Sequence, residues 1–80
     1  FNPETLLQFN VPSEMDVSLS IWNTRGQLMK ILVHQKESPG LHHVIWNGKD
    51  SFGRNVPSGT YFVRLKSDRY ILSQKMLLIR

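Results

Sequence analysis

Residues 46–66 read WNGKDSFGRNVPSGTYFVRLK, and this stretch decides the fold of the chain. It opens on Trp46, continues through a run of turn-forming residues, and closes on a segment in which every second side chain from Tyr61 to Leu65 is apolar. Such alternation is typical of a half-buried β-strand. Trp46 itself ends another alternating segment, residues 42–46. The stretch therefore predicts two strands joined by a long loop, with Trp46 as the main core anchor.

Similar short segments extend this pattern over the rest of the chain. They lie at residues 5–11, 17–22, 27–33 and 70–79. Gly26 can adopt the positive φ of a tight turn, so residues 23–26 are expected to form a hairpin. Alanine, the best helix former, does not occur in the sequence. The chain is therefore predicted to be all-β, an Ig-like antiparallel β-sandwich of about seven strands.

The alternation also predicts which side chains face the core. Inward positions are expected at Leu7, Phe9 and Val11, at Val17, Leu19 and Ile21, at Val44 and Trp46, and at Met76 and Leu78. Ser18, Ser20 and Trp22 are expected to face outward. Residues 27–33 fit no single alternation, so we predict a bulge there, with Met29 and Leu32 inward.

Length and composition restrict the class of protein. Eighty residues allow one small domain whose core has no room for a large internal cavity. Cysteine is absent, which excludes a disulfide framework, and no apolar run is long enough to cross a bilayer. The net charge of +4 gives a mild bias toward anionic partners. Because the chain begins at Phe1 without a methionine, residues 1–80 are expected to be a single Ig-like C-terminal domain excised from a larger precursor.

No residue pattern in the chain predicts catalysis, a cofactor or a metal. His42 and His43 are adjacent on a predicted strand, so their rings leave opposite faces and cannot chelate one ion. We expect His42 at the edge of the core and His43 in solvent. No serine lies in a nucleophile elbow, and the carboxylates are scattered over turns and ends, which argues against paired-carboxylate chemistry. The chain is predicted not to be an enzyme.

Asp50 supports two interpretations. With Asn47 nearby and a loop after it, its carboxylate suggests a calcium ligand, although one carboxylate is far from the ligand set of that ion. The favoured interpretation is an Asx turn, in which Asp50 accepts hydrogen bonds from backbone amides of its own loop.

Basic and aromatic side chains are predicted on outer faces. Arg64 and Lys66 share one face of a strand and Lys75 lies on its hairpin partner, which indicates either a cationic patch for phosphate or an anionic glycan, or a solvated face that discourages edge aggregation. No nucleic-acid motif accompanies them. Trp22 and Phe62, also outward, mark either a contact surface or a cover against a neighbouring domain.

Four motifs stand in the order and spacing of a known family. They are F-N-P-E-T at 1–5, W-N-G-K-D at 46–50 leading to Gly53, P-S-G-T-Y at 57–61 and K-M-L-L-I-R at 75–80. On these motifs the chain resembles the FlgD-type Ig-like domain of flagellar hook-capping proteins, in the variant known as the type IX secretion C-terminal sorting domain. Asn47, where aspartate is usual, and His43, where a smaller residue is commoner, depart from the pattern, and Asn47 weakens the case for a charged loop site.

The resemblance implies a non-catalytic C-terminal sorting domain. Such a domain directs a secreted bacterial protein across the periplasm and outer membrane to the outside or the cell surface, and its partners are the outer-membrane secretion machinery and the upstream cargo domain of the same precursor. The secretion machinery is expected to recognise the exposed loop at Pro57, Ser58 and Gly59 and the last strand, with Lys75 and Arg80 directed outward. Trp46, Asp50, Gly53 and Tyr61 are expected to be structural, and the Tyr61 hydroxyl to need a partner if its ring is buried.

Two alternatives accompany the sorting hypothesis. One is a structural or adhesive Ig-like accessory module of a surface enzyme, contacting glycan through Trp22. The other is the Ig-like domain of a flagellar hook-capping protein itself.

Overall fold

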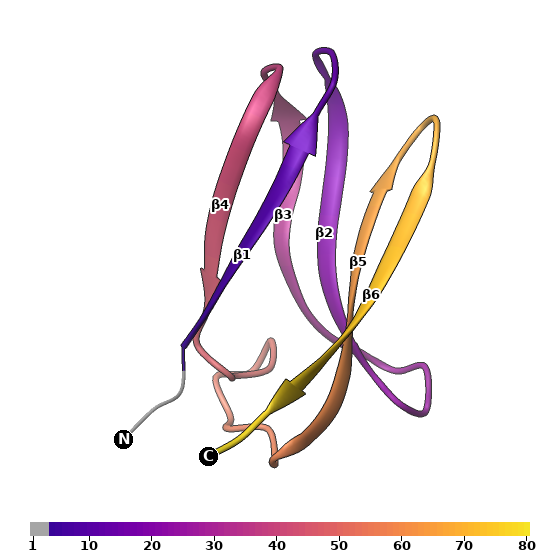
Figure 1. Ribbon diagram of the computed structural model, residues 1–80. Coiled ribbons are helices and arrows are strands. Elements are labelled where there is room, and N and C mark those ends of the chain that lie inside the picture. The colour runs from indigo at the N-terminus through magenta and orange to yellow at the C-terminus, as the bar shows by residue number, and fades with distance from the viewer. Residues whose placement is uncertain (1–3) are drawn as a thin grey trace.

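The computed structural model describes residues 4–80, so Phe1, Asn2 and Pro3 of the first motif lie outside the described residues. Within that range the chain forms six strands and no helix, against the seven or so strands expected (Figure 1). The strands are β1 (Thr5–Val11), β2 (Met15–Asn23), β3 (Leu28–Glu37), β4 (Gly40–Trp46), β5 (Gly59–Ser67) and β6 (Ile71–Leu78). No helix that could span a membrane occurs in residues 4–80.

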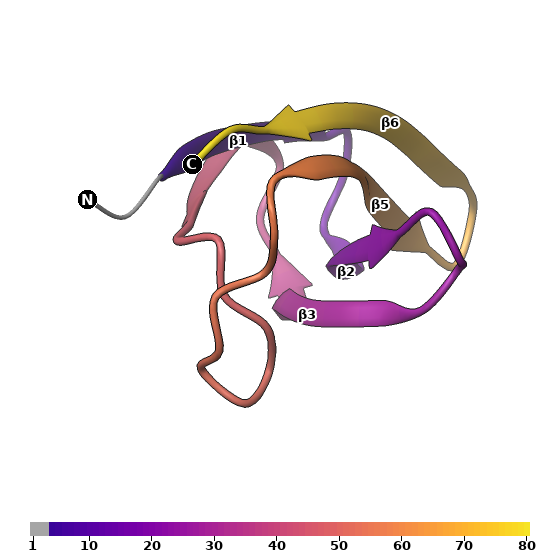
Figure 2. The ribbon, with the colours of Figure 1, turned by 90° about the horizontal axis from the view of Figure 1, so that it is seen from below.

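The strands form two antiparallel sheets that face each other (Figures 1 and 2). The smaller sheet pairs β1 with β4, and the larger has the order β3-β2-β5-β6. The pairing of β2 with β5 joins two hairpins, β2–β3 and β5–β6, into that larger sheet. The predicted all-β, Ig-like sandwich is thereby confirmed.

Alternation along the strands determines which face of each sheet is buried. In β1 the exposed residues alternate with Leu7, Phe9 and Val11, which turn toward the larger sheet as predicted. The strand boundaries of β1 agree with the predicted segment, whereas β2 begins earlier, at Met15, because this side chain is also buried.

The core is divided into two clusters. The hairpin-end cluster contains Phe9, Val11, Met15, Val17, Leu19 and Leu65. The loop-end cluster contains Ile21, Trp46, Val56, Tyr61 and Leu78. Trp46 has no exposed surface and its ring meets the Tyr61 ring edge-on at 5.6 Å between centroids, which confirms its predicted place in the core.

The irregular pattern of β3 has the predicted cause. Its register against β2 shifts twice, between Leu19 and Ser20 and between Ile21 and Trp22. These irregularities let Met29 and Leu32 pack against the loop-end cluster, as predicted. The strand runs on to Glu37, four residues beyond the predicted end, because its last residues continue to pair with the start of β2.

The β2–β3 hairpin turns as predicted at Gly26, whose φ is +77°. The Asn23 side chain completes the turn by accepting hydrogen bonds from the amides of Arg25 and Gln27, both at 2.9 Å. An L-residue with a branched side chain is strained at this φ, so glycine is required there by the backbone.

Candidate functional site

The loop between β4 and β5, residues 47–58, is organised by Trp46 beneath it. The indole Nε1–H of Trp46 donates a hydrogen bond to the carbonyl of Lys49 at 2.9 Å. Across the loop, the Val56 amide donates to the Gly48 carbonyl at 3.0 Å, and Val56 is buried in the loop-end cluster. Gly48 has a φ of +73°. The W-x-G-x-D motif therefore builds a loop that is anchored to the core by a hydrogen bond from Trp46 and by the buried side chain of Val56.

Asp50 holds the turn at the tip of this loop. Its Oδ1 accepts hydrogen bonds from the amides of Phe52 at 2.9 Å and Arg54 at 3.0 Å, and its Oδ2 pairs with Arg54 Nε at 3.0 Å. Partial loss of hydration acts to raise the pKa of Asp50, but the bonds from the Arg54 and Phe52 amides and the Arg54 guanidinium outweigh it and hold this pKa below its ordinary value. The Asx-turn interpretation of Asp50 is thereby confirmed.

Tyr61 fastens the second half of the loop. Its ring is buried, and its hydroxyl donates a 2.6 Å hydrogen bond to the carbonyl of Pro57, four residues upstream. This is the partner that the sequence predicted for a buried tyrosine. Burial raises the pKa of Tyr61, although the nearby positive charge of Arg80 opposes the shift.

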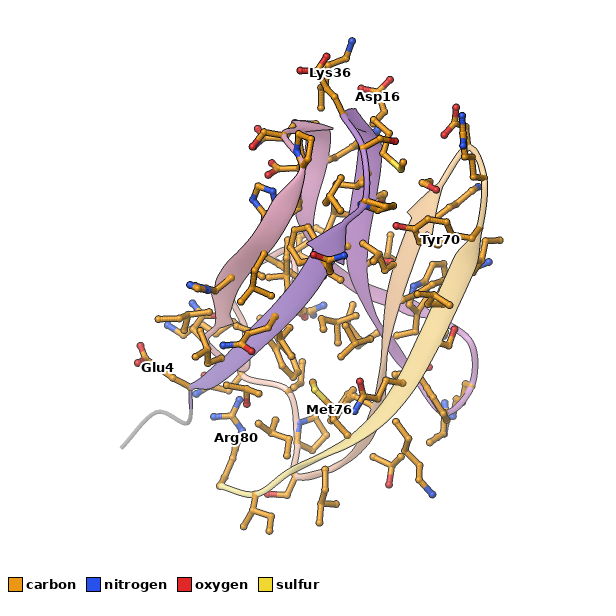
Figure 3. All side chains as sticks on the ribbon, turned by 45° about the horizontal axis from the view of Figure 1, so that its top comes forward. Glu4, Asp16, Lys36, Tyr70, Met76 and Arg80 are labelled. Carbon is orange, nitrogen blue, oxygen red and sulfur yellow. The ribbon has the colours of Figure 1, made fainter. Side chains whose placement is uncertain are left out.

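Arg80 is exposed, as expected, but its guanidinium is not directed freely outward as Lys75 is. Its guanidinium turns back under the loop, where it donates to the carbonyls of Val56 and Gly48 (Figure 3). Its backbone amide donates to the Ser58 hydroxyl at 3.0 Å. The physical reason is that β6 ends beside loop carbonyls that a planar guanidinium can satisfy two at a time. Lys75 is exposed, as expected.

The five residues predicted to be read by a partner are therefore only partly free. Pro57 and Ser58 are exposed and Gly59 is half-exposed at the start of β5. Arg80 and Ser58 are tied together, whereas Lys75 lies on β6 across from Phe62. The loop and the last strand thus meet in one contact network, and Lys75 belongs to a different surface.

That other surface is the outer face of the larger sheet, where the predicted contact residues come together. Trp22 on β2 lies directly opposite Phe62 on β5, and the Arg64 guanidinium stacks over the Trp22 ring at 5.2 Å. Lys66 lies further along β5 on the same face and is exposed. Both aromatic side chains are half-exposed, and the Arg64 guanidinium covers part of the Trp22 ring.

Ser20 faces outward, as predicted, but the sequence did not predict that it is covered there. It is buried beneath the indole of Trp22, whose Nε1–H donates to the Ser20 hydroxyl at 2.8 Å. The signal was present in the sequence, since residues two apart on a strand share a face and a large indole can cover a serine. The sequence does not show which way the indole leans.

His42 and His43 lie on opposite faces of β4, as predicted. His42 stacks on Phe9 with ring centroids 5.3 Å apart, and its ring nitrogens contact the Glu37 carboxylate at 3.0 Å and the Ser38 carbonyl at 2.7 Å. The sequence analysis missed this Glu37 contact, which spans the β3–β4 turn. Within residues 4–80 no group of three His, Cys, Asp or Glu side chains is placed to hold a metal ion.

A groove of about 510 Å³ opens between β1 and β6, where the two sheets are not joined by a shared strand. Phe9, Leu65, Tyr70 and Leu72 line it; Tyr70 reaches toward β1 from the β5–β6 turn (Figure 3). Below, this feature is called the β1–β6 groove. The sequence analysis excluded only a large enclosed cavity and did not predict an open side of the sandwich.

A family model matches the chain in sequence, and a solved structure matches it in fold. A family model described as the FlgD Ig-like domain matches residues 3–69. A solved structure of FlgD from P. aeruginosa superposes with a TM-score of 0.73 at 21% sequence identity, covering 95% of this chain. The chain spans 61% of the length of that solved chain, and at this identity the likeness shows the fold alone. No curated protein matches the chain in sequence.

Proposed function

Because this chain belongs to the FlgD Ig-like domain family, we propose that it is a non-catalytic module that docks onto another protein. The observation that carries the proposal is the FlgD-like sandwich, which accounts for nearly the whole chain. The residues singled out by the motifs support it, since Trp46, Asp50 and Tyr61 are occupied in holding the loop and bear no arrangement of a nucleophile and a base.

Within that role, the function best supported is that of the Ig-like domain of a flagellar hook-capping protein. The family match and the FlgD structure both support it. In such a protein the chain would present its surfaces to other subunits of a growing structure, and its own interior would serve only to keep those surfaces rigid.

A chimaera tests this function. In a P. aeruginosa strain without FlgD, residues 1–80 replace the matched part of FlgD, and swimming is measured in soft agar. We expect motility above that of a strain whose FlgD lacks the matched part, and loss of it with Trp46→Ala, which disrupts the fold. A chimaera that accumulates and is folded but leaves the cells non-motile would overturn the hook-capping role.

A second candidate function, the type IX C-terminal sorting domain, is favoured by one specific observation. Three of the four motifs of that resemblance share one contact network, in which Arg80 at the end of the K-M-L-L-I-R segment binds carbonyls of the loop that begins with W-x-G-x-D. This segment, residues 75–80, lies wholly beyond residue 69, where the family match ends. The partner in this case is an outer-membrane secretion machine, and the protein is exported to the outside or the cell surface.

Export of a reporter separates the two candidates. Residues 1–80 are fused to a periplasmic reporter in a bacterium with type IX secretion, beside a native sorting domain as the positive control and the matched part of P. aeruginosa FlgD as the negative one. Export that is lost on deletion of residues 70–80 supports sorting. Retention of the intact fusion, in a host that exports the positive control, eliminates it.

A further inference from the structure

The outer face of the larger sheet presents three rows of side chains, with one residue from each of its four strands in every row. The register defines them: in the first row, Trp22 lies opposite Leu28 on β3 and Phe62 on β5, and Phe62 lies opposite Lys75 on β6. Three apolar side chains thus stand side by side and end on a cation at the sheet edge.

The other two rows follow toward the β5–β6 turn. The second consists of Ile31, Ser20, Arg64 and Ser73. The third consists of His34, Ser18, Lys66 and Ile71. These three rows, which we call the outer-face rows, contain three cations and no carboxylate. The carboxylates of Asp16, opposite Lys36, and Asp68 lie one row further on and line one hollow with Lys66 (Figure 3).

The surface of this face is uneven, with hollows that can accept side chains of a partner protein. The stack of Arg64 on Trp22 forms a ridge, and hollows of about 340 and 240 Å³ lie beside it. Leu28 and Ile31 line the smaller hollow and Ile71 lines the larger, and all three are exposed. Aromatic and arginine side chains surrounded by aliphatic ones are the composition of protein–protein interface cores.

We propose that the outer-face rows dock an acidic surface of a partner protein, one that places apolar side chains in the hollows and carboxylates against Arg64, Lys66 and Lys75. This inference rests on the docking role proposed above and names the class of partner. Charge complementarity selects it, because the rows hold three cations and no acid, with Asp16 and Asp68 bordering them only at the Lys66 end, so that the rows attract negative charge and repel positive charge.

The same charges argue against two other occupants. A second copy that met this face with its own would bring together the three cations of each copy, Arg64, Lys66 and Lys75, with no carboxylate in the rows to offset them. A glycan needs an open aromatic ring to stack on, but the Trp22 ring carries the Arg64 guanidinium and its N–H is bound to Ser20. The exposed aliphatic side chains of the rows would gain nothing from a sulfated or phosphorylated sugar.

The test uses synthetic probes and the folded chain of residues 1–80. An eight-residue peptide in which glutamates alternate with leucine and phenylalanine is titrated into labelled protein, and binding is followed by the indole N–H signal of Trp22. Three further probes are the same peptide with lysine for glutamate, the same peptide with serine for its apolar residues, and heparin. We expect the acidic apolar peptide to bind tightest and to shift signals of the outer-face rows.

Matched variants locate the site. The triple variant Arg64→Glu, Lys66→Glu, Lys75→Glu should bind the peptide at least about tenfold more weakly, as expected for three exposed charge pairs. Its control, Arg25→Glu, Lys36→Glu, Lys49→Glu, makes the same change of net charge outside the rows and should bind like the unmodified chain.

Three results would overturn the proposal. Equal binding of heparin or the serine peptide would show a simple anion-collecting surface, and equal binding of the lysine peptide would remove charge complementarity. Equal weakening by both triple variants would show that net charge and not this face decides. Because binding is measured on the isolated chain, failure here leaves the motility and export results intact, and failure of those leaves this result intact.

Discussion

The two clusters of the core are closed in different ways. The loop-end cluster is covered by a loop whose backbone is bonded to the residues beneath it, through Trp46, Tyr61 and Arg80. The hairpin-end cluster has no such cover, and the β1–β6 groove opens beside it, although Phe9 and Leu65 in the groove wall are themselves almost fully buried. One sandwich thus contains a sealed end and an open end.

The difference between the two ends indicates that the family motifs serve to hold the loop over the core. Of the motif residues that the structure describes, those that hold the loop, Trp46, Asp50, Tyr61 and Arg80, lie at the sealed end, where polar groups removed from water must be satisfied. The open end is built from ordinary alternating strands and needs no special residue. We therefore expect substitutions at the sealed end to cost more stability than equivalent ones at the open end.

The largest contrast is expected between Trp46→Ala and Phe9→Ala. Trp46 is wholly buried and its N–H supports the loop, so its truncation should cost about 3–5 kcal/mol of unfolding free energy. That is a large part of the total stability of a small domain. Phe9 lines the groove, where the surroundings can relax, and its truncation should cost less. Urea unfolding of both variants measures the difference, and a Trp46→Ala protein that unfolds close to the wild type contradicts the sealed-end model.

A smaller contrast is expected between Tyr61→Phe and Tyr70→Phe. The first substitution removes only the hydroxyl that bonds the Pro57 carbonyl, at a cost of about 1 kcal/mol. The Tyr70 hydroxyl makes no hydrogen bond within residues 4–80, so the second should be nearly neutral. Thermal unfolding compares them, and equal changes in the two variants would show that the bond to Pro57 contributes nothing.

The third contrast concerns pH. The pKa of Asp50 is lower in the folded chain than its ordinary value, so the carboxylate stabilises the fold above a pH of about 4, and this contribution is lost as pH falls through the lower, folded pKa. Asp50→Asn should therefore be less stable than the wild type at pH 7, and the gap should narrow in acid. Asp68→Asn, at the opposite end, serves as the control. A gap that stays constant from pH 7 to acid would show that the Asp50 charge is not involved.

The sequence predicted the sealed end better than the open one, for a physical reason. Alternation and turn residues are local signals, so the strand faces, the Gly26 hairpin and the Asp50 turn could be read from neighbours in the chain. The direction of Arg80 could not, because its partners lie more than twenty residues away. The β1–β6 groove could not either, because it depends on which strands end at the edges of the two sheets.

The smallest effect is expected at Leu72, and it gives the sharpest test of the open end. Leu72 and Leu78 lie on the same strand and the same face, since Leu72 pairs with Leu65 and Leu78 with Gly59. Yet Leu72 is 58% exposed at the groove, whereas Leu78 is 3% exposed in the loop-end cluster. Leu78→Ala should cost about 2–5 kcal/mol and Leu72→Ala less than about 1 kcal/mol, because little apolar surface of Leu72 is removed from water on folding. Chemical unfolding measures the loss of unfolding free energy in each variant. Because residue type, strand and face are the same, the comparison reports how much more of Leu78 than of Leu72 is buried on folding. If Leu72→Ala proves as costly as Leu78→Ala, the groove is closed in solution and the two ends of the sandwich are equally sealed.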